Sequence, residues 1–324
     1  MTKTGRPSRL IAACGASLAL AIPAAAAAEE PAPGVAFSGF VDGAALIPTS
    51  GYEPGARGVT FGVDQVELDL RAAPSPDLAV AADLNVFPST AAPLTGDSLF
   101  EQAFVTWSPA PIEGLSLTLG KRNAPIGIES IDPVDMYQYS SGLLFRYATP
   151  SNLTGLFAGY EAGNTSALLM ATAPWDTPAG SAGVLVGGRV QQIAGPATLG
   201  LSATHGPLPT PDEADPQLMV DVDAKVELDG LTLFGEFNYG SLGDDTSIGY
   251  LVAANYAVTS STSVTLRGDS LDREFGTIIK QTDLTVALLH SLSGNLAATL
   301  EYKYQMPDQG DDQSLAALEF TAKF

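Results

Sequence analysis

Few residues of this chain have the types and spacing that catalysis requires. The 324 residues include two histidines, His205 and His290, and one cysteine, Cys14. A hydrolase needs a nucleophile with a positioned base, and the sequence suggests no Ser-His-Asp arrangement around either histidine. Cys14 lies in a segment that we expect to be removed on export, so no thiol remains for catalysis or disulfides. We therefore expect neither an enzyme nor a bound cofactor.

Acidic residues are the next candidates for chemistry. Asp308, Asp311 and Asp312 lie close together, as do Asp244 and Asp245, and carboxylates are preferred ligands of divalent cations. Their spacing matches no complete metal-binding loop. We therefore interpret them as solvated acids of connecting loops and expect no metal site.

The charge balance excludes one class of partner. Removing Lys3, Arg6 and Arg9 from the 15 basic residues leaves 12 bases against 36 acids, a net charge of −24 for the mature chain. Nucleic-acid binding depends on basic side chains that neutralise phosphates. Nucleic acid is therefore excluded as an expected partner.

The first 28 residues have the layout of a secretory signal peptide. Lys3, Arg6 and Arg9 precede a short apolar run at 10–22, and small residues at 24–28 offer cleavage sites. The run is shorter than the ~20 apolar residues that a spanning helix needs. We expect cleavage near Ala28 and a single mature domain at 29–324.

The end of the chain has the pattern of a lipid-facing strand. One face of residues 314–324 is apolar and the other polar, with Ala316, Leu318, Phe320, Ala322 and Phe324 opposite Glu319, Thr321 and Lys323. Such alternation over ~10 residues is typical of transmembrane barrels. It recurs at 66–71, 115–119, 218–228 and 296–305. Because no stretch after residue 30 reaches the length of a spanning helix, a membrane-spanning form must be a closed barrel.

Turn signals indicate the number of strands. Short turns are expected at 74–76, 109–111, 163–164, 195–196, 229–230, 260–261 and 294–295, and longer polar connections at 48–58, 88–97, 205–216, 240–246, 269–276 and 307–313. Steps between the short turns are 35, 54, 32, 34, 31 and 34 residues, so one hairpin has a long outer loop, at 122–152. The pattern predicts an all-β transmembrane antiparallel barrel of 16 strands, wide enough for an aqueous channel.

The long loop carries a family resemblance. Residues 120–122, 125–129, 137–140 and 150–155 resemble outer-membrane β-barrel porins of the OmpL-like type. The match centres on 114–173, about a fifth of the mature chain, and the remainder agrees only in pattern. The resemblance implies a porin, and the substrates of the family are generally unassigned.

The same loop is the candidate pore constriction. It is too apolar to remain in water, with residues such as Ile126, Ile128 and Phe145, so we expect this third outer loop to fold into the lumen. Acids on the loop would face bases on the wall and set a field across the pore, namely Glu129, Asp132 and Asp135 opposite Arg71, Arg122 and Arg189. The alternatives are that the loop packs over the rim, that residues 139–147 extend the sheet, and that the three acids are simply solvated.

The alternation also predicts the charge of the lumen. The expected inward acids are Glu67, Asp69, Asp83, Asp221, Asp223, Glu227, Glu236, Asp269, Asp283, Glu301 and Glu319, and the inward bases are Arg71, Arg189, Lys225, Arg267, Lys303 and Lys323. An acidic lumen concentrates cations. We expect an outer-membrane pore for ions and small hydrophilic solutes with modest cation preference, surrounded by lipid. An alternative is a structural or surface-interaction barrel with an occluded lumen. Association into a homo-oligomer stays open.

Overall fold

The computed structural model describes residues 34–50, 58–85, 99–175, 183–208 and 216–324. The expected signal peptide at 1–28 lies outside this part of the chain. No helix among the described residues is long and apolar enough to cross a membrane.

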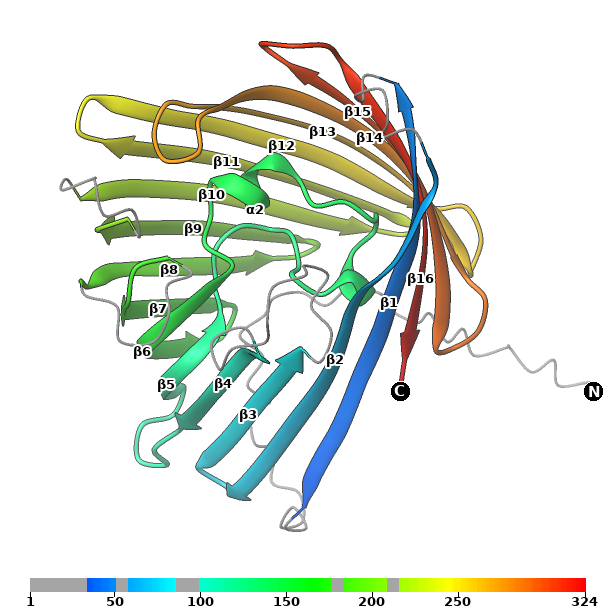
Figure 1. The fold of residues 1–324 in the computed structure, drawn as a ribbon. Coiled ribbons are helices and arrows are strands. Elements are labelled where there is room, and N and C mark those ends of the chain that lie inside the picture. Colours follow the sequence, from blue (N-terminus) through cyan, green and yellow to red (C-terminus); the bar gives the residue numbers. More distant parts are fainter. Residues whose placement is uncertain (1–33, 51–57, 86–98, 176–182, 209–215) are drawn as a thin grey trace, which may run out of the picture.

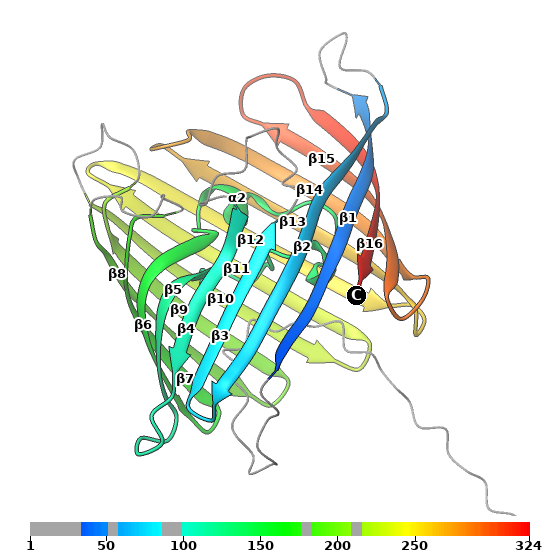
Figure 2. The same cartoon turned by 60° about the horizontal axis from the view of Figure 1, so that its bottom comes forward.

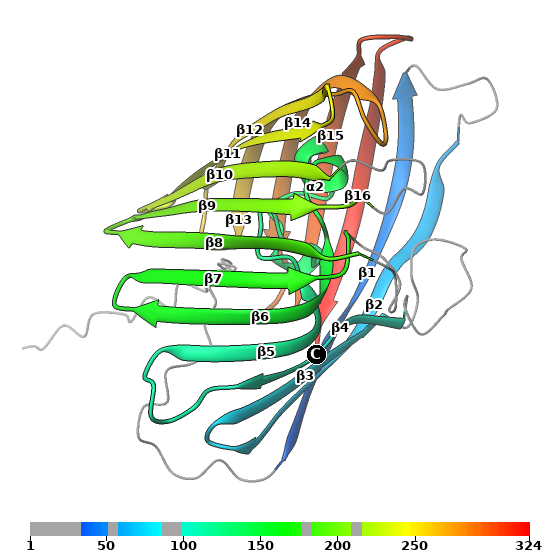
Figure 3. The ribbon, with the colours of Figure 1, turned by 90° about the vertical axis from the view of Figure 1, so that its left-hand side faces the viewer.

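Sixteen antiparallel strands form a closed barrel in which β1 pairs with β16 (Figures 1 and 2). The strands are β1 (Val35–Ser50), β2 (Thr60–Ser75), β3 (Leu78–Asn85), β4 (Phe100–Trp107), β5 (Leu115–Asn123), β6 (Asn152–Ala162), β7 (Thr165–Thr172), β8 (Leu185–Ala194), β9 (Ala197–Gly206), β10 (Gln217–Leu228), β11 (Leu231–Leu242), β12 (Asp245–Ala257), β13 (Thr262–Arg273), β14 (Ile279–Ser291), β15 (Leu296–Pro307) and β16 (Gln313–Lys323). Each strand pairs with its neighbours in sequence, which Figure 3 shows for β5 to β9. The predicted fold class and strand number are confirmed.

Alternation along the strands divides the barrel into two faces. On β13, Leu266 is 59% exposed, whereas its neighbour Arg267 is 3% exposed. The pairing register places Leu266 beside Val286 and Arg267 beside Thr285, so like faces align across strands. In a closed barrel the exposed apolar face is the outer one, and the buried polar face is the inner one. This is the arrangement that the alternation predicts.

All seven short turns join consecutive strands at the predicted places. Two of the predicted longer connections are wrong in extent. Leu242 pairs with Asp245 across a two-residue turn, because Gly243 adopts a φ of 57° that suits a tight hairpin. β13 continues to Arg273, which pairs with Ser247, so the connection begins after it. The predicted connections at 48–58, 88–97 and 205–216 include residues outside the described part.

Apolar side chains also occur on the inner face, which the sequence did not indicate. One buried cluster contains Ala124, Ile126, Leu153, Phe157, Leu168, Met170, Trp175, Leu185, Leu208, Met219, Leu242 and Phe275. A second contains Leu143, Leu144, Ala148, Phe234, Leu251, Ala253 and Leu271. Both clusters combine strand residues with the chain between β5 and β6. That segment therefore has its own apolar packing surface.

Candidate functional site

The segment at 124–151 connects β5 to β6 and is closed at its base. Asn123 pairs with Asn152, and the Ala124 N–H donates to the Ser151 carbonyl over 2.9 Å. Because Arg122 and Asn123 belong to β5, the loop is slightly shorter than predicted. It contains the 3-10 helix η1 (Pro133–Asp135) and the helix α2 (Leu143–Tyr147) (Figure 1). Residues 139–147 do not extend the sheet, which was one alternative.

Helix α2 packs against β12 and β13. Leu143 and Leu144 have no exposed surface and lie among Leu251 and Leu271. The Leu143 N–H donates to Asp269 over 2.8 Å, so a carboxylate of β13 satisfies one free N–H at the helix start. Apolar burial and this hydrogen bond together fix α2 on the strands.

Arg267 of β13 is the centre of the contact between strands and segment. Its side chain is fully buried and bonds Asp269 through Nε over 2.8 Å. Its Nη1 contacts Glu129 over 3.1 Å and the Ser140 carbonyl over 2.5 Å. Nη2 donates to the Ser141 carbonyl over 3.3 Å. The Arg267 guanidinium therefore joins two parts of the segment, Glu129 and the pair Ser140 and Ser141, to the wall.

Glu129 is held from several directions within the segment. It accepts hydrogen bonds from the Gln138 amide over 3.0 Å and from the Gly142 N–H over 2.8 Å. A Cβ on Gly142 would lie 2.7 Å from Glu129 Oε2, so this close approach requires glycine. Burial raises the pKa of Glu129, and the adjacent Arg267 opposes that rise. The Glu129 carboxyl therefore connects parts of the segment to each other and to Arg267, and it is not freely solvated.

Further hydrogen bonds join the segment to strands around the barrel. They run from Ile128 N–H to Glu236 (2.9 Å), from Ser140 N–H to Glu301 (3.0 Å), from the Tyr139 hydroxyl to Asp64 (3.2 Å) and from Lys323 to Asp135 (3.2 Å). The wall partners belong to β2, β11, β15 and β16. The segment is therefore attached to strands that are distant from its own ends.

Asp132 lies beside acids of β2 and β4. Carboxylate oxygens of Asp132, Glu67 and Glu101 lie within 4.8 Å of one another. Burial, followed by repulsion from Glu101, raises the pKa of Asp132 to about 8. The separation would suit a bridging cation, but the Gln65 amide already donates to Glu67 over 3.1 Å and to Glu101 over 3.3 Å. The cluster is thus bridged by an amide donor.

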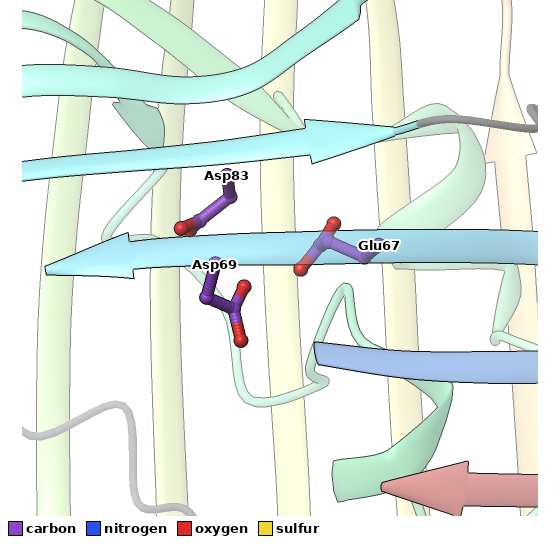
Figure 4. A group of neighbouring side chains, drawn as sticks. All are labelled: Glu67, Asp69 and Asp83. Carbon is purple, nitrogen blue, oxygen red and sulfur yellow. The ribbon is translucent and has the colours of Figure 1, made fainter. Parts of the chain in front are cut away.

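A second acidic group occupies the neighbouring part of the wall. Glu67, Asp69 and Asp83 also have oxygens within 4.8 Å of one another, and Figure 4 shows them on β2 and β3. Arg71 donates to both oxygens of Asp83 and thereby offsets part of this charge. The wall at β2–β4 therefore carries a concentration of acids.

The predicted constriction residues have other partners than expected. Among the described residues, the ion pairs of the loop acids join Glu129 to Arg267 and Asp135 to Lys323. The three predicted wall bases are placed elsewhere: Arg71 pairs with Asp83, Arg189 pairs with Asp223 (2.6 Å), and Arg122 lies over the rings of Phe104 (5.9 Å) and Phe157 (5.3 Å). Whether all six line the narrowest point stays a prediction.

The predicted inner-face charges lie mainly on the buried side of the strands. Arg71, Glu227 and Lys323 are the exposed members, near strand ends. Two inner acids were missed, Asp42 at 3% exposure and Glu101 at 5%. Each is the single charged residue of its strand, so no repeat of charges marked its face. His205 is in β9 and not in a loop, and His290 is in β14.

Solved porins have the same fold. The chain resembles an anion-selective porin from Comamonas acidovorans (TM-score 0.67, 15% identity, covering 90% of this chain and 100% of that one). It also resembles OmpF of Salmonella typhi in complex with daunomycin (TM-score 0.68, 12% identity, 90% and 98% covered). The trimer form of OmpT from Vibrio cholerae gives a TM-score of 0.67 at 9% identity, with 90% and 100% covered.

The sequence itself identifies the family. No protein with a curated description matches the chain. Residues 78–316, however, match the family described as "Putative beta-barrel porin-2, OmpL-like", which is well over half of the chain. The predicted resemblance is therefore confirmed, and the porin class is that of a channel and not of an enzyme. The chain belongs to this OmpL-like β-barrel porin family and is a porin-like channel of the outer membrane.

Proposed function

We propose that the protein is a passive pore for ions and small hydrophilic solutes, narrowed by the 124–151 segment. The observation that carries this proposal is the Arg267 contact. A lumen-side guanidinium holds Glu129 and two serine carbonyls of the segment. Because inner-face side chains provide the anchors, the segment occupies the lumen and leaves a reduced passage.

The inner-face charges support a modest cation preference. Acids outnumber bases on the wall, and the Gln65 amide that donates to Glu67 and Glu101 beside Asp132 has no positive charge to offset theirs. A passage lined by net negative charge raises the local concentration of cations, and salt screens this effect over ~10 Å at 0.1 M.

An occluded structural barrel is the second candidate. The buried apolar cluster that joins Ala124 and Ile126 to β6, β7 and β8 favours it, because this cluster fills part of the inner face. The two functions differ in one measurable property. A pore conducts ions across a bilayer, whereas an occluded barrel does not.

Planar-bilayer recordings with a salt gradient test the proposal. We expect discrete conductance steps and a reversal potential of cation-selective sign. Recorded above pH 8, where the docked Asp132 carboxyl is ionised, the triple change Glu129→Gln, Asp132→Asn and Asp135→Asn should reduce the cation preference and change the conductance while the barrel still folds. A parent reversal potential of anion-selective sign would refute the cation preference. Unaltered conductance and selectivity in the triple variant would remove these acids from the constriction.

Two further properties belong to the proposal. Cleavage near Ala28 should leave a mature barrel of 29–324, which N-terminal sequencing of the purified protein checks. One similar porin is recorded in a trimer form. We propose that this chain also forms a homo-oligomer, and chemical cross-linking in intact membranes measures it.

A further inference from the structure

A pocket lies between the 124–151 segment and the inner face of β8, β9, β10 and β11. Its volume is about 80 Å³. One water needs roughly 10–15 Å³, so the pocket encloses several waters or part of one small ring. The pocket lies near the short turns of 195–196 and 229–230, because its wall residues belong to the adjoining ends of these strands.

The segment side of the pocket combines an apolar, aromatic part with polar groups. Ile128, Met136 and Tyr137 form the apolar part together with Phe234 of β11, and the polar lining residues are Glu129, Ser130, Asp135 and Gln138. The two acids are paired with bases outside the pocket, Glu129 with Arg267 and Asp135 with Lys323. The rings of Tyr137 and Phe234 stack with centroids 5.8 Å apart and planes 28° apart. Phe234 is buried beneath, so the Tyr137 ring has a rigid support. The result is a flat apolar platform of fixed orientation.

The strand side is polar and balanced in charge. Arg189 donates to both oxygens of Asp223, over 2.6 and 2.9 Å, and Lys225 contacts Glu227 over 2.9 Å. Since each cation already has an acidic partner, a charged solute gains no net attraction here. A hydroxyl both donates and accepts, so it can bond to the remaining lone pairs and N–H groups of such pairs. Gln191 and Thr198 line the same side.

We propose that this pocket is a solute subsite for a small neutral polyhydroxylated ring, about the size of one sugar unit. The apolar face of the ring lies on Tyr137, and its hydroxyls bond to the charge-balanced wall. Pockets of this kind combine apolar surface with a few placed polar groups. The inference rests on the proposed pore function, because the solute reaches the pocket through the lumen.

Sugar-dependent reduction of the ion current in planar bilayers tests the subsite. We expect D-glucose to reduce the current saturably, and the open-chain polyol sorbitol and the charged analogue gluconate to act much more weakly. Tyr137→Ala should raise the half-saturating glucose concentration about three- to tenfold, the range of one aromatic stacking contact. Thr198→Val, which keeps the side-chain shape, should raise it as well. Tyr302→Ala, on the exposed outer face, is the matched control and should not change it.

Equal effects of glucose and sorbitol on the parent would overturn the subsite, as would a half-saturating concentration that Tyr137→Ala leaves unchanged. Failure of the pore function is recognised separately, because the parent would then show no current steps at all. In that case calorimetric titration of the detergent-solubilised parent and Tyr137→Ala proteins with D-glucose decides on the subsite. Tyr137-dependent heat supports the subsite, and its absence overturns it.

Discussion

Arg267 should control the conductance of the pore, because it connects the wall to the segment. Replacement by alanine leaves Glu129 and Asp269 buried without their cation and removes the donors to two carbonyls of the segment. Removing one partner of a buried ion pair costs about 3–5 kcal/mol. At 1.4 kcal/mol per tenfold, the population of the undocked segment should rise by about two to three and a half orders of magnitude.

The barrel itself should survive the change. Backbone pairing of β13 with β12 and β14 does not involve the Arg267 side chain, and Leu143 and Leu144 remain buried against the strands. Burial of each leucine contributes about 1.5–3 kcal/mol, so the segment retains part of its docking energy. We therefore expect frequent transitions to a higher conductance and not a permanently open pore.

Single-channel recording is the assay, with gel mobility before and after heating as the check of folding. Arg273→Ala is the matched control, since Arg273 is also a buried arginine of β13, and its Nε donates to the Phe275 carbonyl over 2.9 Å and not to the segment. The control should keep the parent's current noise. If folded Arg267→Ala has the conductance and noise of the parent, Arg267 does not hold the segment in the lumen.

Three further predictions concern the same contacts. The pKa of the Asp132 carboxyl is about 8 in the docked segment and 3.8 when the carboxyl is in water. Between these two pH values the docked carboxyl is neutral and the free carboxyl is charged, so ionisation of Asp132 opposes docking. Docking should be tightest below pH 4 and should weaken as pH rises toward 8, so that current noise recorded between pH 4 and 9 increases with pH in the parent and less steeply in Asp132→Asn. Gly142→Ala places a Cβ 2.7 Å from Glu129 and should expose the segment to protease, whereas Gly294→Ala, with open space around it, should not. Leu144→Ala should cost about 2–5 kcal/mol of docking and raise the rate of proteolysis within 139–149, which mass spectrometry can follow.

The barrel was predictable because lipid imposes a local rule on every strand. In 296–305 and 314–324, side chains facing outward must be apolar, so alternation marks the strands and turn residues separate them. The rule fails where an inner face is also apolar, as at Leu168 and Met170 of β7, which pack with the loop-derived cluster. Sequence alternation indicates which face of the sheet a side chain lies on, but not which part of the chain covers that face.

The partners of the segment were not predictable. Glu129 and Arg267 are 138 residues apart, and no local pattern indicates that they meet. The apolar residues of the segment did indicate that it packs on a surface. Its orientation, however, depends on closure of the barrel, which brings β13 opposite β5, and on glycine at position 142. The choice of basic partners for the loop acids therefore required the fold.

Deletion of the segment tests the central claim most directly. Ala124 and Ser151 are joined by a backbone hydrogen bond, so two glycines in place of residues 126–149 can close the β5–β6 hairpin. Single-channel conductance of the parent and the shortened chain is the measurement. A pore narrowed by the segment predicts steps in the parent and clearly larger steps in the shortened barrel. Steps of the same size in both proteins would contradict the account, and so would a silent parent.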